Sequence, residues 1–122
     1  MTFLRAAFGI TIHEGYGQTE ALLQSAVDKN DLSSGLVGGP APATKFRLRD
    51  IEEMGYLHTD DPPRGELQFY CNTAFTGYFK NPERTAEALT EDGWINSGDV
   101  CVIYPNASIK IIDRAKNIFK LA

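Results

Sequence analysis

The chain has 122 residues, of which 43% are hydrophobic, so it can bury one modest core and falls in the size range of a single domain. Its formal net charge of −4 offers no general attraction to nucleic acid or to an anionic membrane, and we expect no nucleic-acid partner. No apolar run approaches the roughly 20 residues that cross a bilayer, and the N-terminal residues lack a secretory pattern. We therefore expect a soluble, intracellular protein with no transmembrane segment in this chain.

The first part of the chain predicts helix, strand, loop and helix in turn. Apolar residues between positions 3 and 8 have helical spacing, and Gly9 is a natural helix stop before an apolar strand from Ile10 to Ile12. Gly15 and Gly17 are expected to end this strand in a loop, and the segment from Thr19 to Leu23 favours a new helix. A loop between a strand and a helix is a usual place for a ligand in α/β proteins.

From Gly35 onward, glycine, proline and alternating apolar residues indicate a small antiparallel β unit with one helix. The helix is predicted to begin at Asn81 and Pro82, an N-cap followed by proline at the first helical position, and to run toward Gly93. The aromatic residues between Phe69 and Phe79 lack interleaved basic residues, so core packing is expected. Strands are predicted at residues 45–51, 66–71, 100–104 and 109–112.

Cysteine and histidine give no sign of a metal or catalytic centre. Cys71 and Cys101 stand apart, without the paired spacing of a zinc site, and we expect two reduced thiols in strands. His13 and His58 lack a carboxylate or cysteine partner at useful spacing, so we expect them to be structural or facing solvent.

The segment from Gly15 to Glu20 carries side chains suited to a nucleotide. Tyr16 offers a flat ring to a purine, and Gly17 lets the backbone approach a ligand closely. Thr19 supplies a hydroxyl for a phosphate oxygen, and Glu20 supplies a carboxylate oxygen of the kind that Mg²⁺ prefers. The alternative is an ordinary turn in which Thr19 and Glu20 begin a helix, since short motifs recur by chance.

Asp99 ends a second informative segment, which starts at Gly93. A carboxylate at the tip of a Gly-Asp turn can accept hydrogen bonds from two vicinal hydroxyls, the arrangement that a ribose presents. Arg114, beyond the next predicted hairpin, has a guanidinium able to reach ribose and phosphate oxygens together. The alternative is a surface ion pair of Arg114 with Asp99 or Asp113, which contributes little energy.

These segments, followed by Ile112 to Ala122, resemble in their order the ATP-dependent acyl-activating (adenylate-forming) enzymes, and most closely the long-chain fatty acyl-CoA synthetases. The resemblance covers nearly the whole chain, and Asn117 to Ala122 favours the long-chain branch. It implies an α+β fold. Residues 1–34 would form the C-terminal edge of an α/β nucleotide-binding subdomain, residues 35–113 a small distorted antiparallel β-barrel subdomain, and residues 114–122 a hinge toward a C-terminal lid domain.

The resemblance also assigns roles to individual residues. Lys116 matches the position of the hinge at which the lid rotates, with a solvated lysine at a strand end as the alternative. The nucleotide and metal contacts that the resemblance implies are adenine and acyl-adenylate for Tyr16 and Gly17, phosphate for Thr19, Mg²⁺ for Glu20, ribose for Asp99, and ribose with phosphate for Arg114.

In this family a fatty carboxylate attacks the α-phosphate of Mg·ATP to give acyl-AMP and pyrophosphate, and the sulfur of coenzyme A then displaces AMP. The resemblance therefore implies a segment of a long-chain fatty acid–CoA ligase, with fatty acid, ATP and coenzyme A as partners and Mg²⁺ as cofactor. Two alternatives stay open. One is a non-catalytic remnant or interaction module with weak nucleotide binding, and the other is a luciferase-like or aryl-CoA ligase.

Some departures from the family pattern bear on activity. The sequence shows no Gly/Ser/Thr-rich phosphate loop followed by lysine and no lid lysine, so we expect the 122 residues alone to be inactive and to expose apolar faces that favour self-association. Ala107 stands where the family has glycine in the predicted turn from Pro105 to Ser108. A positive φ at Ala107 would cost energy, so we expect another turn type there.

Overall fold

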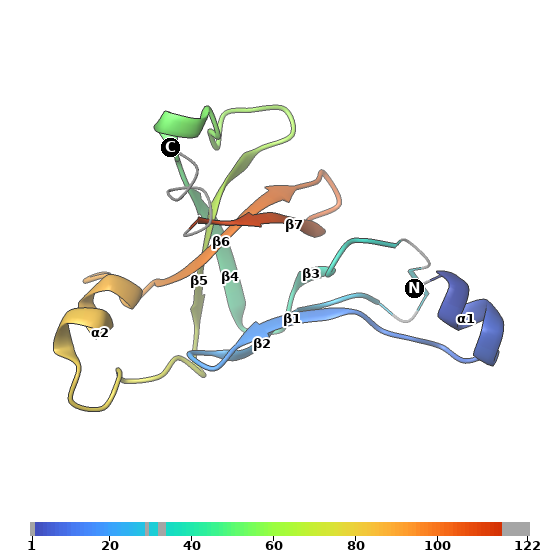
Figure 1. The fold of residues 1–122 in the computed structure, drawn as a ribbon, viewed down its shortest axis with the longest axis horizontal. Coiled ribbons are helices and arrows are strands. Elements are labelled where there is room, and N and C mark those ends of the chain that lie inside the picture. The colour runs from blue at the N-terminus through green and yellow to red at the C-terminus, as the bar shows by residue number, and fades with distance from the viewer. Residues whose placement is uncertain (1, 29, 32–33, 116–122) are drawn as a thin grey trace.

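Two antiparallel β-sheets and two short α-helices make up the described part of the chain, which in this computed structural model comprises residues 2–28, 30–31 and 34–115 (Figure 1). The strand orders are β1–β2–β3 and β4–β5–β6–β7, so sheet neighbours follow one another along the chain. The predicted α+β class is confirmed. In chain order the elements are α1 (Thr2–Phe8), β1 (Gly15–Gln18), β2 (Leu22–Ala26), β3 (Gly39–Pro40), β4 (Thr44–Arg49), the 3₁₀ helix η1 (Glu52–Met54), β5 (Arg64–Cys71), α2 (Pro82–Ala88), β6 (Ile95–Ile103) and β7 (Ile109–Arg114).

The core lies on the four-stranded sheet. Leu67 and Phe69 of β5 are fully buried with Ile95 and Cys101 of β6, and Ala21, from the turn between β1 and β2, joins the same cluster. Successive side chains of a strand point to opposite faces, so Leu67 and Phe69 share one face of β5. Phe69 was expected in the core, whereas Tyr70 is 41% and Phe79 89% exposed, so the core packing predicted for these two residues is wrong.

Helix α2 begins where the sequence predicts and ends earlier. The side chain of Asn81 accepts a hydrogen bond from the backbone N–H of Arg84 at 3.1 Å, and Pro82 occupies the first helical position. The helix stops at Ala88, because Leu89 is extended and bridges to β6 instead of continuing toward Gly93. Leu89, the residue directly after the helix, is thus connected to the edge of the sheet.

Three predictions for the first part of the chain are wrong. The loop expected around Gly15 and Gly17 is instead strand β1, because its backbone pairs with β2. Residues 10–12 form no strand, because a strand requires a neighbouring strand to satisfy its backbone groups. Ile10 is 56% exposed. The helix expected from Thr19 is instead a turn followed by β2, which pairs antiparallel with β1. Tertiary pairing overrides the helix propensity of this short segment, as helices shorter than about 12 residues are marginal without packing.

The turn between β6 and β7 takes a conformation that we did not expect. Ala107 has a φ of 62°, so the alanine adopts the left-handed region that was expected to be avoided. Hydrogen bonds hold it there: the N–H of Ala107 donates to the carbonyl of Tyr104 at 2.8 Å, and the side chain of Asn106 accepts from the N–H of Ser108 at 3.1 Å. These bonds offset the local strain.

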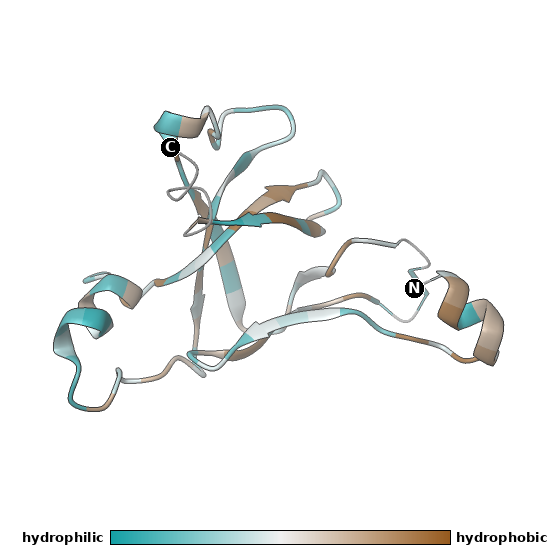
Figure 2. Cartoon of the chain, in the orientation of Figure 1, coloured by the Kyte–Doolittle hydropathy of each residue, from teal (hydrophilic) through white to brown (hydrophobic). Residues whose placement is uncertain are grey.

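Helix α1 places apolar side chains at the outer end of the molecule, where Figure 2 colours it largely hydrophobic. None of its residues is buried, and Phe3 and Phe8 are 79% and 67% exposed. Within residues 2–28, 30–31 and 34–115, no helix is long and apolar enough to cross a membrane.

Candidate functional site

The β1–β2 hairpin brings two side chains onto Asp99 of β6. The hydroxyl of Tyr16 donates to Asp99 Oδ2 at 2.7 Å, and Gln18 Nε2 donates to the same oxygen at 3.1 Å. Gln18 Nε2 also donates to the Tyr16 hydroxyl at 2.8 Å and to the carbonyl of Ser97 at 2.7 Å. The three side chains form a closed hydrogen-bonded group that joins the two sheets.

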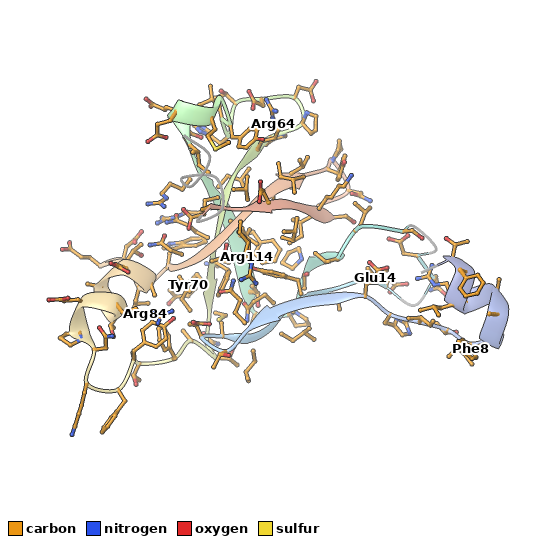
Figure 3. The ribbon with its side chains drawn as sticks, in the orientation of Figure 1. Phe8, Glu14, Arg64, Tyr70, Arg84 and Arg114 are labelled. Atoms are coloured by element: carbon orange, nitrogen blue, oxygen red, sulfur yellow. The ribbon has the colours of Figure 1, made fainter. Side chains whose placement is uncertain are left out.

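Asp99 is only 6% exposed, yet its second oxygen, Oδ1, faces an exposed cation. Asp99 and Arg114 are directly opposite each other in the β6–β7 ladder, and Arg114 Nε lies 3.4 Å from Asp99 Oδ1. The Arg114 side chain is 75% exposed and projects from the end of β7 (Figure 3). The ion pair considered from the sequence is therefore present, and it leaves acceptor capacity on Oδ1, because a long contact to an exposed cation does not fill that oxygen's lone pairs.

A tight turn in β6 presents Asp99. The ladder between β5 and β6 shifts register between Glu66 and Gln68, and Gly98 has a φ of 71°. The Ser97 hydroxyl lies 3.0 Å from the N–H of Asp99, which donates to it. The Gly-Asp turn expected from the sequence is thus a bulge inside a strand, held by side chains on both sides.

Burial and the Asp99 charge govern the titration of two neighbours. Burial and the hydrogen bond to Asp99 raise the pKa of the Tyr16 hydroxyl far above its ordinary value, so the hydroxyl remains a donor at any physiological pH. Burial, followed by the charge of Asp99, raises the pKa of the Cys101 thiol to about 12. Cys101 is therefore an unreactive thiol in a strand, as the sequence predicts.

The surroundings of Gly17 and Thr19 differ from those expected of residues that contact a nucleotide. A Cβ added at Gly17 would lie 2.2 Å from the carbonyl oxygen of Leu22, so the close approach at this glycine is between the two strands of the hairpin. Thr19 is exposed in the turn after β1. Its hydroxyl lies outside the group formed by Tyr16, Gln18 and Asp99.

Glu20 is held by a tyrosine. The hydroxyl of Tyr78 donates to Glu20 Oε1, which raises the pKa of Tyr78. The backbone fixes the same residue, since the N–H of Phe75 donates to the Glu20 carbonyl at 2.8 Å. Among the described residues, no group of three or more His, Cys, Asp or Glu side chains can hold a metal ion. Glu20 fits a single protein ligand of a phosphate-bound Mg²⁺, which usually takes one or two carboxylates and keeps several waters.

The structure thus gathers Tyr16, Asp99 and Arg114, and it keeps Thr19 and Glu20 outside this group. Lys116, the predicted hinge residue, lies outside the described residues. His58 pairs with Asp50 at 2.9 Å on the surface, while His13 Nδ1 is 3.4 Å from the carbonyl of Val27, so neither histidine joins the site.

Sequence reasoning missed Gln18 and Tyr78 as contributors to this region. Gln18 was passed over inside the motif, and Tyr78 was assigned to core packing. The amide of Gln18 and the phenol of Tyr78 could have indicated such a role, since a buried or half-buried amide or phenol usually has a hydrogen-bond partner. The partners themselves are 81 and 58 residues away, which no local pattern reports.

Comparison with known proteins finds relatives of this chain in sequence and in fold. A family model described as AMP-binding enzyme matches residues 1–79. The chain is 48% identical over 124 residues to long chain acyl-CoA synthetase 7, peroxisomal, of Arabidopsis thaliana, and 46% identical over 123 residues to human long-chain-fatty-acid–CoA ligase 1. Both alignments cover the whole of this chain and 18% and 17% of the relatives, so the chain spans less than a fifth of their length.

Solved structures of related enzymes share the fold. The A-PCP didomain of the carboxylic acid reductase from Segniliparus rugosus, in complex with AMP, superposes with a TM-score of 0.80 at 33% identity, covering 95% of this chain and 15% of that one. A malonyl-CoA ligase complex with methylmalonyl-CoA and AMP bound gives 0.76 at 35% identity, covering 91% and 23%. With a family model matching residues 1–79 and sequence relatives aligned along its entire length, the chain belongs to the AMP-binding enzyme family.

Proposed function

We propose that this chain is the nucleotide-binding wall of a long-chain fatty acid–CoA ligase. The ligase would join a fatty acid to AMP from ATP, releasing pyrophosphate, and then pass the acyl group to the sulfur of coenzyme A. Support comes from the 42–48% identity to long-chain acyl-CoA synthetases and ligases, against 33–35% to the reductase and malonyl-CoA ligase structures. Names of relatives that include a peroxisomal enzyme favour an intracellular location.

One observation carries the assignment of the ribose contact: Asp99 is buried, and its two oxygens are in different environments. Oδ2 accepts from Tyr16 and Gln18, which fixes the carboxylate, while Oδ1 faces Arg114 at 3.4 Å. A fixed anion with spare acceptor capacity beside an exposed cation suits a ligand that has both hydroxyls and a phosphate. We assign the ribose hydroxyls to Oδ1 of Asp99 and a phosphate oxygen to Arg114.

The neighbouring residues complete the proposed wall. Tyr16 packs its ring against the core and donates its hydroxyl to Asp99, so it orients the carboxylate in addition to lying beside the adenine. Thr19, exposed in the hairpin turn, is assigned to a phosphate oxygen. Glu20, steadied by Tyr78, is assigned to the Mg²⁺ that accompanies the phosphates, where the ion would offset their negative charge.

The first test is nucleotide binding by the chain itself, measured by NMR titration with AMP. Asp99→Ala should weaken AMP binding at least about tenfold, because hydrogen bonds to charged groups contribute about 1.5 to 3 kcal/mol each. Asp113→Ala is the matched control, since this neighbouring exposed carboxylate also contacts Arg114, through the backbone N–H at 2.6 Å. Equal affinities of the wild-type and Asp99→Ala chains for AMP would reject the assignment of Asp99 to the ribose.

A second test addresses the substrate. The segment of human long-chain-fatty-acid–CoA ligase 1 that aligns with this chain, at 46% identity, can be replaced by these 122 residues. The chimera should activate palmitate and lose that activity on Asp99→Ala. A chimera that activates benzoate in preference to palmitate would support an aryl-CoA ligase instead.

A further inference from the structure

Glu66 of β5 is a carboxylate with 2% exposure that contacts the turn carrying Asp99. Its Oε1 accepts the backbone N–H of Gly98 at 3.0 Å, and its Oε2 pairs with the guanidinium of Arg49 on β4. Gly98 immediately precedes Asp99, and the β5–β6 register shifts beside Glu66. Glu66 therefore fixes the backbone from which the Asp99 side chain projects.

The strands are built to bring these groups together. Glu66 lies opposite Arg49 in the β4–β5 ladder. Gly65 permits the approach, because a Cβ there would lie 2.6 Å from the carbonyl oxygen of Arg49. A buried carboxylate costs free energy unless it is paired and hydrogen-bonded, and Glu66 has both kinds of partner. A cation that is 58% exposed thus supports a buried anion, which in turn holds a backbone amide of the β6 turn.

A second cation on β4 offers a comparison within the same sheet. Arg47 Nε donates to Gln68 Oε1 at 2.6 Å, and Gln68 Nε2 donates to Asn96 Oδ1 at 2.5 Å. This connection also runs from β4 across β5 to β6, but it reaches Asn96, ahead of the Gly98 turn, and passes through a neutral amide. Arg47 is 39% exposed and also lies over the ring of Trp94, 4.3 Å from its centroid. Its loss should cost stability without releasing the turn.

We propose that Glu66, supported by Arg49, is a positioning residue for ribose recognition: it holds the Gly98 turn so that Asp99 keeps the orientation needed to accept the ribose hydroxyls. The proposal rests on the assignment of Asp99 to the ribose. Glu66 itself does not contact the nucleotide. It acts by limiting the rotation of the Ser97–Gly98 peptide, because the N–H of Gly98 would otherwise be left without its carboxylate acceptor.

The test compares AMP with 2′-deoxy-AMP. The dissociation constant for 2′-deoxy-AMP divided by that for AMP, both measured by NMR titration of the full chain, reports how well the site senses a ribose hydroxyl. Glu66→Ala should reduce the affinity for AMP about tenfold and bring the ratio close to one. Arg49→Gln, a surface change that leaves Glu66 in place, should lower the ratio in the same direction. The Gly98 amide proton resonance should move upfield in both variants, as its hydrogen bond to the carboxylate weakens.

The outcomes separate this proposal from the ribose assignment. Arg47→Gln is the matched control and should lower the melting temperature while the ratio of dissociation constants, 2′-deoxy-AMP over AMP, stays at the wild-type value. If Glu66→Ala fails to fold, Arg49→Gln decides. A wild-type ratio in the Glu66 and Arg49 variants, with a reduced ratio in Asp99→Ala, would overturn the positioning role alone. A wild-type ratio in Asp99→Ala would overturn the ribose assignment, and the positioning role with it.

Discussion

Tyr16 and Asp99, which are 83 residues apart in the sequence, are joined by a hydrogen bond of 2.7 Å from the phenol to the carboxylate. The bond connects β1 of the three-stranded sheet to β6 of the four-stranded sheet. It places the two most specific motifs of the sequence in one site. It also adds to the expected role of Tyr16, because the hydroxyl holds Asp99 in addition to any contact that the ring makes with a purine.

Tyr16→Phe should destabilise the chain and weaken AMP binding, although the aromatic ring is retained. Removing the hydroxyl takes one donor from Asp99 Oδ2 and one acceptor from Gln18, and hydrogen bonds to charged groups contribute about 1.5 to 3 kcal/mol. Urea unfolding measures the loss of stability, and NMR titration measures AMP affinity. Tyr70→Phe is the control, since it keeps the ring that packs 5.9 Å from Trp94. Equal, negligible effects of the two substitutions would show that the Tyr16 hydroxyl contributes nothing.

Gly17→Ala should disrupt the hairpin that carries Tyr16 and Gln18. The new Cβ would lie 2.2 Å from the carbonyl oxygen of Leu22, so the strands would have to separate. We expect a loss of at least about 2 kcal/mol, toward the upper end of the range for single substitutions. Gly39→Ala in β3 meets its nearest atom at 3.4 Å and should change stability by less than about 1 kcal/mol. Thermal unfolding of both variants checks the difference, and similar melting temperatures would contradict it.

Local sequence patterns predicted the elements that are stabilised by interactions between residues close together in the sequence. Asn81 and Pro82 predict the start of α2 through helix capping, and the apolar residues Leu67 and Phe69 of β5 lie in the core. The alternation does not predict that Glu66 and Gln68 of the same strand are buried too. The hairpin of β1 and β2 was missed, because its sequence favours a helix and only pairing with a neighbouring strand reverses that preference. The predicted subdomain boundaries, after residue 34 and after residue 113, stay a prediction.

The site was predicted in part for the same reason. Tyr16, Asp99 and Arg114 were found through motifs that reflect their chemistry, and cross-strand pairing brings Asp99 and Arg114 together. Glu66 and Gln18 act on Asp99 or its turn through contacts 32 and 81 residues apart, so no spacing rule reveals them.

Glu20→Gln should reduce the gain in ATP affinity that Mg²⁺ provides, because a charged oxygen ligand is replaced by a weaker one. Tyr78→Phe should reduce that gain by a smaller amount, since Glu20 stays charged but loses the hydroxyl that holds its Oε1. Dissociation constants for ATP with and without Mg²⁺ give the comparison, with Glu91→Gln as a control on an exposed carboxylate of the same region. An unchanged Mg²⁺ effect in Glu20→Gln would withdraw the metal assignment.

The 122 residues alone should produce no acyl-CoA from palmitate, Mg·ATP and coenzyme A. The chain spans 17–18% of its relatives, and Thr19 and Arg114 are exposed, so a nucleotide would meet one open wall. Stabilising the transferred group requires charges positioned on several sides. A radiolabelled palmitate assay against a no-protein blank tests this expectation. Turnover that disappears in Asp99→Ala would show that the chain is sufficient for catalysis.

Cys101 should make the stability of the chain decrease at alkaline pH in a measurable way. Burial and the nearby Asp99 charge raise the thiol pKa from its ordinary value of 9.0 to about 12 in the folded chain. The contribution is fully present below pH 9.0 and is lost as pH rises toward about 12, because the unfolded thiol ionises first. Urea unfolding of wild type and Cys101→Ala from pH 8 to 11 isolates the effect, since the cavity left by alanine costs the same at each pH. The difference in unfolding free energy between the two chains should shrink above pH 9.0. A constant difference would show that Cys101 titrates alike in the folded and unfolded chains.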